Sequence, residues 1–341
     1  MTAARAALLA AGVALGGAAL VGGAALRALS PVDGSAAVVV LEVPSGASLP
    51  RIARQLEEAG VVRSARAFEL LARWRGLASE LRSGEYELSP ALGTGDLLDQ
   101  IAQGRVRTHR VALPEGLTAV EVAARLEAQG LVDAEAFLHV VRSAETARTL
   151  GVEGEGLEGY LFPETYHLAR GLDALEIAGA MVAQFLDVWR EIAAEATERG
   201  LGMEQVVTLA SLVEKETAVP DERPLVAGVF HNRLQRGMRL ETDPSVIYGI
   251  PDFDGNLRRA HLEDEANPYN TYRIPGLPPS PIANPGAESL RAVVRPAETE
   301  HLYFVSRNDG SHVFSRTYRE HLAAVRRYQK PAARRDASTR R

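Results

Sequence analysis

The chain has 341 residues, enough for about two domains, and its 46% hydrophobic and 24% charged residues are ordinary proportions for a folded protein. Its formal net charge of −6 argues against a nucleic-acid-binding protein, which would normally carry a basic face. The absence of cysteine excludes thiol catalysis, disulfide bonds and thiolate metal sites.

The first feature along the chain is an uncharged run at residues 6–26, bracketed by Arg5 and Arg27. Its length matches the roughly 20 residues that a membrane-spanning helix needs, although it consists mostly of Ala and Gly. A cleaved signal peptide is the alternative, but the run exceeds the ~7–15 residues of a usual signal core. We therefore expect a single-pass anchor, with residues 1–5 in the cytoplasm and an exported body after a linker at 27–37.

A pattern of strand, turn and helix then occurs twice, about 70 residues apart. The first copy begins with a β-branched strand at 38–43 and its helix ends at Gly60. The second begins at 111–113 and its helix ends at Gly130. Two copies are too few for a solenoid. The alternatives are a duplicated αβ packing unit and a pair of small carbohydrate-binding modules.

An aromatic loop and a long helix follow the repeat. Residues 157–166 contain three aromatic residues, a Gly and a Pro. Aromatic faces can stack on sugar rings, and the alternative is a rigid loop at a domain seam. Apolar residues spaced i, i+4, i+8 and i+11 predict an amphipathic helix at 174–199.

The next helix, predicted at 205–217, ends in two glutamates. At about 100° per residue its apolar residues form one stripe, with Glu214 at one shoulder and Glu216 at the opposite shoulder. A carboxyl group set against an apolar wall keeps its proton, because burial disfavours the anion, and cleavage of a glycosidic bond needs a neutral acid. Periodicity nominates both glutamates and does not choose between them. The alternative is that both are solvated at a fraying helix end.

Polar and aromatic residues farther along suit a sugar-binding groove. They lie near the end of the next helix, in the loop after it, and before a proline-rich loop at 274–282. Rigid loops of this kind are more often functional than accidental. Beyond them, Asn308-Asp309-Gly310 predicts the turn of a closing β-hairpin. The candidate substrate-binding residues are Glu216, Asn232, Thr242, Asp243, Tyr269, Asn270, Thr271 and Tyr272.

The order and spacing of several motifs resemble the MltG/YceG family of endolytic murein transglycosylases, over roughly residues 38–328. The resemblance implies that the catalytic residue is the first glutamate of the Glu-Lys-Glu motif, Glu214. It also implies a membrane anchor and a first module similar to a LysM domain. The motifs are Leu-Glu-Gly-Tyr-Leu-Phe-Pro-Glu-Thr-Tyr at 157–166, Ala-Ser-Leu-Val-Glu-Lys-Glu-Thr at 210–217, Phe-His-Asn-Arg-Leu at 230–234, Arg-Leu-Glu-Thr-Asp-Pro-Ser-Val-Ile-Tyr-Gly at 239–249, Tyr-Asn-Thr-Tyr at 269–272, Gly-Leu-Pro-Pro-Ser-Pro-Ile at 276–282 and Leu-Tyr-Phe-Val at 302–305.

We therefore predict an α+β protein with an N-terminal membrane helix, a small LysM-like αβ module and a mixed α+β catalytic domain. The expected segments are a cytoplasmic N-terminus at 1–5, a transmembrane anchor at 6–26, a linker at 27–37, the LysM-like module at 38–107, the YceG-like catalytic domain at 108–330 and a disordered basic tail at 331–341.

The resemblance implies cleavage of the β-1,4 bond between N-acetylmuramic acid and N-acetylglucosamine in nascent glycan strands. A single carboxyl group would leave 1,6-anhydro ends and terminate elongation, whereas ordinary glycosidases use a carboxylate pair. The alternatives are a hydrolytic muramidase that pairs Glu214 with Glu216 or Asp243, and a non-catalytic peptidoglycan-binding protein. We expect no metal or cofactor and no nucleic acid. The expected partners are glycan strands, peptidoglycan synthases and the cytoplasmic (inner) membrane, with the catalytic domain on the periplasmic side.

Overall fold

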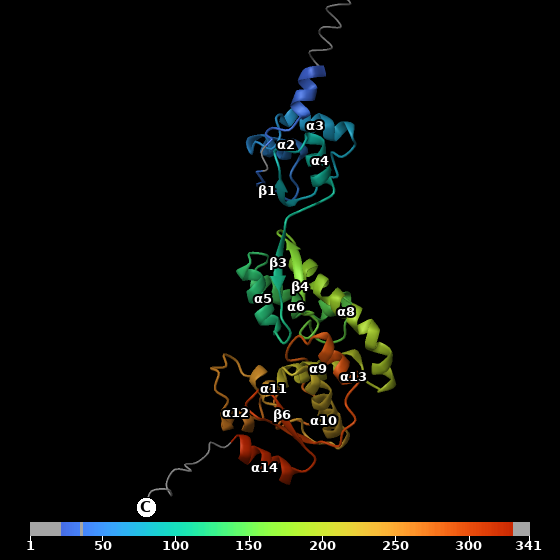
Figure 1. Ribbon diagram of the computed structural model, residues 1–341, viewed down its shortest axis with the longest axis vertical. Coiled ribbons are helices and arrows are strands. Elements are labelled where there is room, and N and C mark those ends of the chain that lie inside the picture. Colours follow the sequence, from blue (N-terminus) through green and yellow to red (C-terminus); the bar gives the residue numbers. More distant parts are fainter. Residues whose placement is uncertain (1–21, 35–36, 330–341) are drawn as a thin grey trace, which may run out of the picture. The chain divides into compact units, whose positions relative to one another are not determined.

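The computed structural model describes residues 22–34 and 37–329, which divide into two compact units. The first unit contains the described residues up to His109 together with His167–Gly171, and the second contains Arg110–Tyr166 and the described residues from Leu172 onward. Helices and two-stranded sheets are mixed along the chain (Figure 1), so the predicted α+β class is confirmed.

The predicted membrane anchor and basic tail lie largely outside the described residues. Residues 22–29 are helical and overlap only the end of the predicted anchor. Within the described ranges, no helix is both long enough and apolar enough to cross a membrane. The predicted tail at 331–341 is not described at all.

The first unit is built around an antiparallel strand pair in which Leu41 lies opposite Tyr86. Helices cover this pair, and Phe68, Tyr86 and Leu97 are fully buried in the resulting core. The Tyr86 hydroxyl stays satisfied inside the core because it donates to the carbonyl oxygen of Arg82, at 2.8 Å. The elements are β1 (Val39–Val43), α2 (Leu49–Glu58), α3 (Ala65–Trp74), β2 (Gly84–Leu88) and α4 (Thr94–Ala102).

The repeat predicted from the sequence appears as two segments with the same order of elements. In each, a strand leads into two helices that pack together, and a second strand pairs with the first. The second copy contains one extra short helix, and its first strand starts earlier than the predicted 111–113. Its elements are β3 (Thr108–Ala112), α5 (Ala119–Ala128), α6 (Ala134–Val141), α7 (Ala144–Thr149) and β4 (Thr165–Ala169).

The rest of the second unit is mainly helical, and α9 is its central helix (Figure 1). Because α8, α10, α11 and α13 all pack on α9, every residue from Val206 to Val213 is buried, whereas the sequence predicted one apolar stripe. The polar residue Ser211 is accommodated because its hydroxyl donates to the Thr208 carbonyl (2.7 Å) and accepts from the Ile282 amide (3.0 Å). The elements are α8 (Ala174–Glu198), α9 (Met203–Glu216), η1 (Pro220–Glu222), α10 (Arg223–Gln235), α11 (Asp243–Tyr248), α12 (Arg259–Glu263), α13 (Ala287–Val294), β5 (Tyr303–Ser306), β6 (His312–Ser315) and α14 (Tyr318–Tyr328).

The predicted closing hairpin is present as β5 and β6, which pair antiparallel with Phe304 opposite Phe314. Asn308 and Gly310 adopt positive φ angles of 65° and 90° in its turn, as the Asn-Asp-Gly sequence predicts. The hairpin also fixes the chain just after α9, because Glu222 accepts from the His312 backbone amide at 2.9 Å. The hairpin is thus bonded to η1, the short helix that follows α9.

Candidate active site

Glu214, near the C-terminal end of α9, is a fixed and paired carboxylate. Its side chain is 6% exposed. One oxygen accepts from the backbone amide of Gly286 at 3.0 Å, and the other accepts from the Arg223 guanidinium at 3.2 Å. Charge-assisted hydrogen bonds such as the one from Arg223 are geometrically specific. The two bonds therefore hold the Glu214 carboxyl group in place at the end of α9.

Arg223 also joins Glu214 to a second carboxylate, because the same guanidinium nitrogen lies 2.9 Å from Glu115. Burial and the negative charge of Glu214 raise the pKa of Glu115, while Arg223 lowers it. A methyl group on Gly286 would overlap the Glu115 carboxylate. Lys215, although exposed, donates to the Gly116 carbonyl at 3.1 Å. The loop at 114–116 is therefore fastened to the end of α9.

Glu216, two residues farther on, has a contrasting environment. The residue is half-buried, and no donor among the described residues forms a hydrogen bond to its carboxyl group. Burial first, and then the negative charge of Asp243, raise its pKa to about 8, while Arg233 lowers it. With a pKa of about 8, the carboxyl group is mostly protonated at neutral pH. Glu216 therefore has a proton to donate.

Asp243 and Tyr272 complete the surroundings of Glu216. Asp243 is exposed at the start of α11 and accepts from the Tyr272 hydroxyl at 2.7 Å. Burial and this bond to Asp243 both raise the pKa of Tyr272, so its hydroxyl remains a donor. Glu216, Asp243 and Tyr272 interact electrostatically. These are three of the residues that the sequence nominated, and the structure brings them together.

The loop that carries Asp243 is held by Arg233, which is 7% exposed. Its guanidinium donates to the Leu240 carbonyl at 2.9 Å and to the Glu241 carboxylate at 3.2 Å. Glu241 has a φ of 51°, a left-handed conformation that is uncommon for residues other than glycine. The conformation just before Asp243 is therefore imposed by tertiary contacts.

Four other predicted binding residues, Asn232, Thr242, Asn270 and Thr271, are buried or half-buried in the second unit. Asn270 and Thr271 are 0% exposed. The Asn270 amide donates to the Asp264 carbonyl at 2.6 Å, and the Thr271 hydroxyl accepts from the amide of Thr242 at 2.9 Å. Asn232 donates to two backbone carbonyls in the segment before β5. The side chains of Asn232, Asn270 and Thr271 are thus bonded to backbone groups, whereas the buried Thr242 hydroxyl has no hydrogen-bond partner among the described residues. Residue type alone does not distinguish a side chain that binds sugar from one that is bonded inside the protein.

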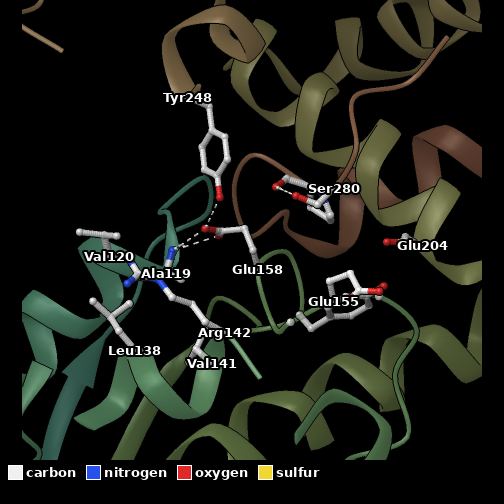
Figure 2. Close-up of a pocket in the computed structure, with 14 residues that line it drawn as sticks. Ala119, Val120, Leu138, Val141, Arg142, Glu155, Glu158, Glu204, Tyr248 and Ser280 are labelled. Carbon is white, nitrogen blue, oxygen red and sulfur yellow. Dashed lines mark hydrogen bonds between the residues drawn. The ribbon is translucent and has the colours of Figure 1, made fainter. Parts of the chain in front are cut away.

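Tyr269 lies with a different group, at the far end of α11. Its hydroxyl bonds that of Ser280 at 2.7 Å, and its ring contacts Tyr248 edge-on with centroids 4.8 Å apart. Tyr248 in turn donates to Glu158 at 3.1 Å. Glu158 and Tyr248 line a cavity of about 200 Å³ (Figure 2).

Sequence reasoning missed Glu158, since it singled out residues 157–166 for their aromatic rings. The Glu158 carboxyl accepts from the Ala119 amide at 3.0 and 3.1 Å and from the Asn284 amide at 3.2 Å. Burial nevertheless raises its pKa to about 7. The sequence signal that could have pointed to Glu158 is a charged residue inside the mostly apolar motif Leu-Glu-Gly-Tyr. Arg223 and Glu115 were missed as well, because only tertiary contacts bring them to Glu214.

Among residues 22–34 and 37–329, no group of three or more His, Cys, Asp or Glu side chains is arranged to hold a metal ion.

Comparisons with known proteins identify the family and several relatives of this chain. The model of the YceG-like family matches residues 41–327. The endolytic murein transglycosylase of Bacillus subtilis is 31% identical over 329 residues, covering 91% of this chain and 91% of that protein. The protein of the same name from Streptococcus pneumoniae is 30% identical over 314 residues, covering 82% of this chain and 56% of its own length. A crystal structure of a YceG-like protein of Listeria monocytogenes matches with a TM-score of 0.59 and 30% identity, covering 85% of this chain and 100% of that one.

Proposed function

The chain belongs to the YceG-like family, and from this premise we propose that it is an endolytic murein transglycosylase, a lyase acting on peptidoglycan. Its substrate would be the β-1,4 bond between N-acetylmuramic acid and N-acetylglucosamine within nascent glycan strands. Cleavage inside a growing strand would end its elongation. Similarity to relatives with this activity in their name, along 91% of the chain, supports the proposal.

We propose Glu216 as the acid that protonates the glycosidic oxygen. The family resemblance implied the first glutamate of the motif, Glu214, and the sequence alone left both open. The observation that favours Glu216 is its environment, since burial and Asp243 raise its pKa to about 8 and leave it protonated at neutral pH. Glu214, the catalytic residue that the resemblance implied, is bonded to Arg223 and Gly286. It stays the alternative acid, and the cleavage rates of Glu214→Gln and Glu216→Gln separate the two.

One carboxyl group acts in both steps of the proposed reaction, first as an acid and then as a base. Glu216 gives its proton to the bridging oxygen as the bond from that oxygen to C1 of the muramic acid breaks. The C6 hydroxyl of the same sugar attacks C1, and its proton passes to the Glu216 carboxylate, which restores the acid. Asp243, oriented by Tyr272, supplies negative charge that stabilises the positive charge developing at C1. No water is added, so the product carries a 1,6-anhydro ring.

Digestion of purified murein, followed by mass spectrometry of the fragments, tests this function. We expect fragments with anhydro ends from the wild-type chain and none from Glu216→Gln. Fragments heavier by one water would instead show a hydrolytic muramidase. Strand binding by the intact protein without any cleavage would show a non-catalytic peptidoglycan-binding protein.

We further propose that residues 6–26 anchor the chain in the cytoplasmic membrane, with the body on the periplasmic side. The uncharged run between Arg5 and Arg27 supports the anchor. The β-α-α-β order of the first unit supports a LysM-like module for glycan strands, and peptidoglycan synthases are the proposed protein partners. Removal of residues 1–30 should move the protein from the membrane fraction to the soluble fraction, and an unchanged distribution would contradict the anchor.

A further inference from the structure

The cavity beside Glu158 contains a polar group that the proposed reaction does not use. Tyr160 lines this cavity and is only 1% exposed. Its hydroxyl has no hydrogen-bond partner among the described residues. Buried hydroxyl groups in folded proteins nearly always have a partner, and leaving one unpaired is unfavourable. The Tyr160 hydroxyl therefore indicates a position where a bound molecule would complete the site.

The charges around the cavity indicate what kind of molecule this is. Glu155, Glu158 and Glu204 line it, and Arg142 is the only lining residue of positive charge among the described residues. Burial raises the pKa of Glu204, and the negative charges of Glu153 and Glu155 raise it further. Glu204 also acts electrostatically on the Tyr160 hydroxyl. An excess of carboxylates beside an unpaired hydroxyl is complementary to a cation with hydrogen-bond donors.

The opposite part of the cavity is apolar and of limited size. Val120, Leu138 and Val141 form its hydrocarbon wall, near Ala119 and Arg142 (Figure 2). The volume of about 200 Å³ corresponds to roughly six or seven water molecules at about 30 Å³ each. This space accommodates an alkyl chain of a few carbon atoms with one polar end.

We propose that the cavity binds a primary ammonium group carried on a short alkyl arm. The ammonium would pair with Glu204 and donate to the Tyr160 hydroxyl, while its methylene groups lie along Val120, Leu138 and Val141. If the proposed function holds, the source of such an arm is a diamino acid in the peptides attached to the glycan strand. Tyr248, at the cavity, and Asp243, beside Glu216, end the same short helix α11, about 8 Å apart along its axis. The cavity would thus recognise the peptide beside the bond to be cleaved.

Binding of small amines to the full chain tests the proposal without any cleavage reaction. Nα-acetyl-lysine N-methylamide is the probe, and Nα-acetyl-norleucine N-methylamide is its control without the ammonium group. By NMR titration we expect the lysine compound to bind at least tenfold more tightly than the norleucine compound. Glu204→Gln should weaken the binding of the lysine compound at least tenfold. Equal affinities for the two compounds, or no binding of either, would overturn the proposal and would leave the assignment of Glu216 untouched.

A pair of tyrosine substitutions separates a ligand-binding role from a structural role. Tyr160→Phe should weaken the lysine compound severalfold and leave the denaturation midpoint of the free protein unchanged or higher, because an unpaired hydroxyl is removed. The matched control is Tyr166→Phe, which removes a hydroxyl bonded to the Phe162 carbonyl at 2.7 Å. This control should lower the midpoint and leave binding of the amine unchanged. A lowered midpoint with unchanged amine affinity in Tyr160→Phe would contradict the site.

Discussion

Two carboxyl groups lie two residues apart at the end of α9, and their surroundings are opposite. Glu214 accepts hydrogen bonds from Arg223 and from the Gly286 amide. Glu216 lacks a bonded donor among the described residues and interacts with another acid, Asp243. The same helix thus presents one carboxyl group held by two hydrogen bonds and one without a bonded donor, whose pKa is raised. The comparison shows that neighbouring elements, rather than the helix itself, decide the surroundings of each glutamate.

The largest expected effect is on cleavage by the two glutamine variants. Glu216→Gln should reduce the cleavage rate by about 10² to 10⁴, the usual contribution of a general acid. Glu214→Gln should stay within about tenfold of wild type, because Gln keeps the shape and one acceptor for the Gly286 amide. Both rates would be measured on murein by release of soluble fragments. The reverse order of the two rates would assign the acid to Glu214.

The two variants should also change stability in opposite directions. Because the folded pKa of Glu216 is raised from 4.5 to about 8, the folded protein binds an extra proton between these values. The free energy of unfolding therefore falls as pH rises through this window. At pH 9, Glu216→Gln should be more stable than wild type by about 3 to 5 kcal/mol, at about 1.4 kcal/mol per pKa unit.

At pH 4, where Glu216 is protonated in both the folded and the unfolded protein, the stability gain of Glu216→Gln should disappear. Glu214→Gln should instead lose about 1.5 to 3 kcal/mol at pH 7, because it weakens hydrogen bonds made to a charged group. Urea unfolding at the three pH values measures both effects. A loss of stability in Glu216→Gln at pH 9 would show that Glu216 is not held neutral.

The pH dependence of the rate tests the role of Asp243. Activity should fall above about pH 8 as Glu216 loses its proton. Asp243→Asn removes a negative charge that raises the pKa of Glu216, so the alkaline limb of the pH profile should move to lower pH. Tyr272→Phe, which keeps this charge and removes only the hydroxyl, should move the limb less. An unchanged limb in Asp243→Asn would mean that Asp243 does not act on the acid.

The smallest expected effect concerns the close packing around Glu214. Gly286→Ala should lower the free energy of unfolding by about 1 kcal/mol, because the added methyl group overlaps the Glu115 carboxylate and this side chain must move away from Arg223. The backbone is not the cause, since Gly286 has an ordinary φ of −77°. Gly179→Ala, inside α8 with its nearest contact at 3.6 Å, is the control and should stabilise by up to about 1 kcal/mol. Equal stability changes in the two variants would contradict the packing argument.

The sequence predicted much of the local structure, because local structure follows from periodicity and turn chemistry. The long helix α8 and the hairpin turn at Asn308 and Gly310 appear where their patterns indicate. The repeat is visible as two strand-helix-helix-strand segments. The burial of α9 on all sides was not predicted, because helices from distant parts of the chain cover faces that carry Thr208 and Ser211.

For the candidate site, the sequence by itself determined that Glu214 and Glu216 both end a helix with an apolar stripe. Only the tertiary structure separates them, because a carboxyl group responds to charges and donors that lie close in space. For Glu214 these come from Arg223 of α10 and from the start of α13, and for Glu216 from Asp243 of α11 and Arg233 of α10. The same reason explains Asn270 and Thr271, whose residue types suit a sugar groove but whose burial was decided by the backbone groups packed around them.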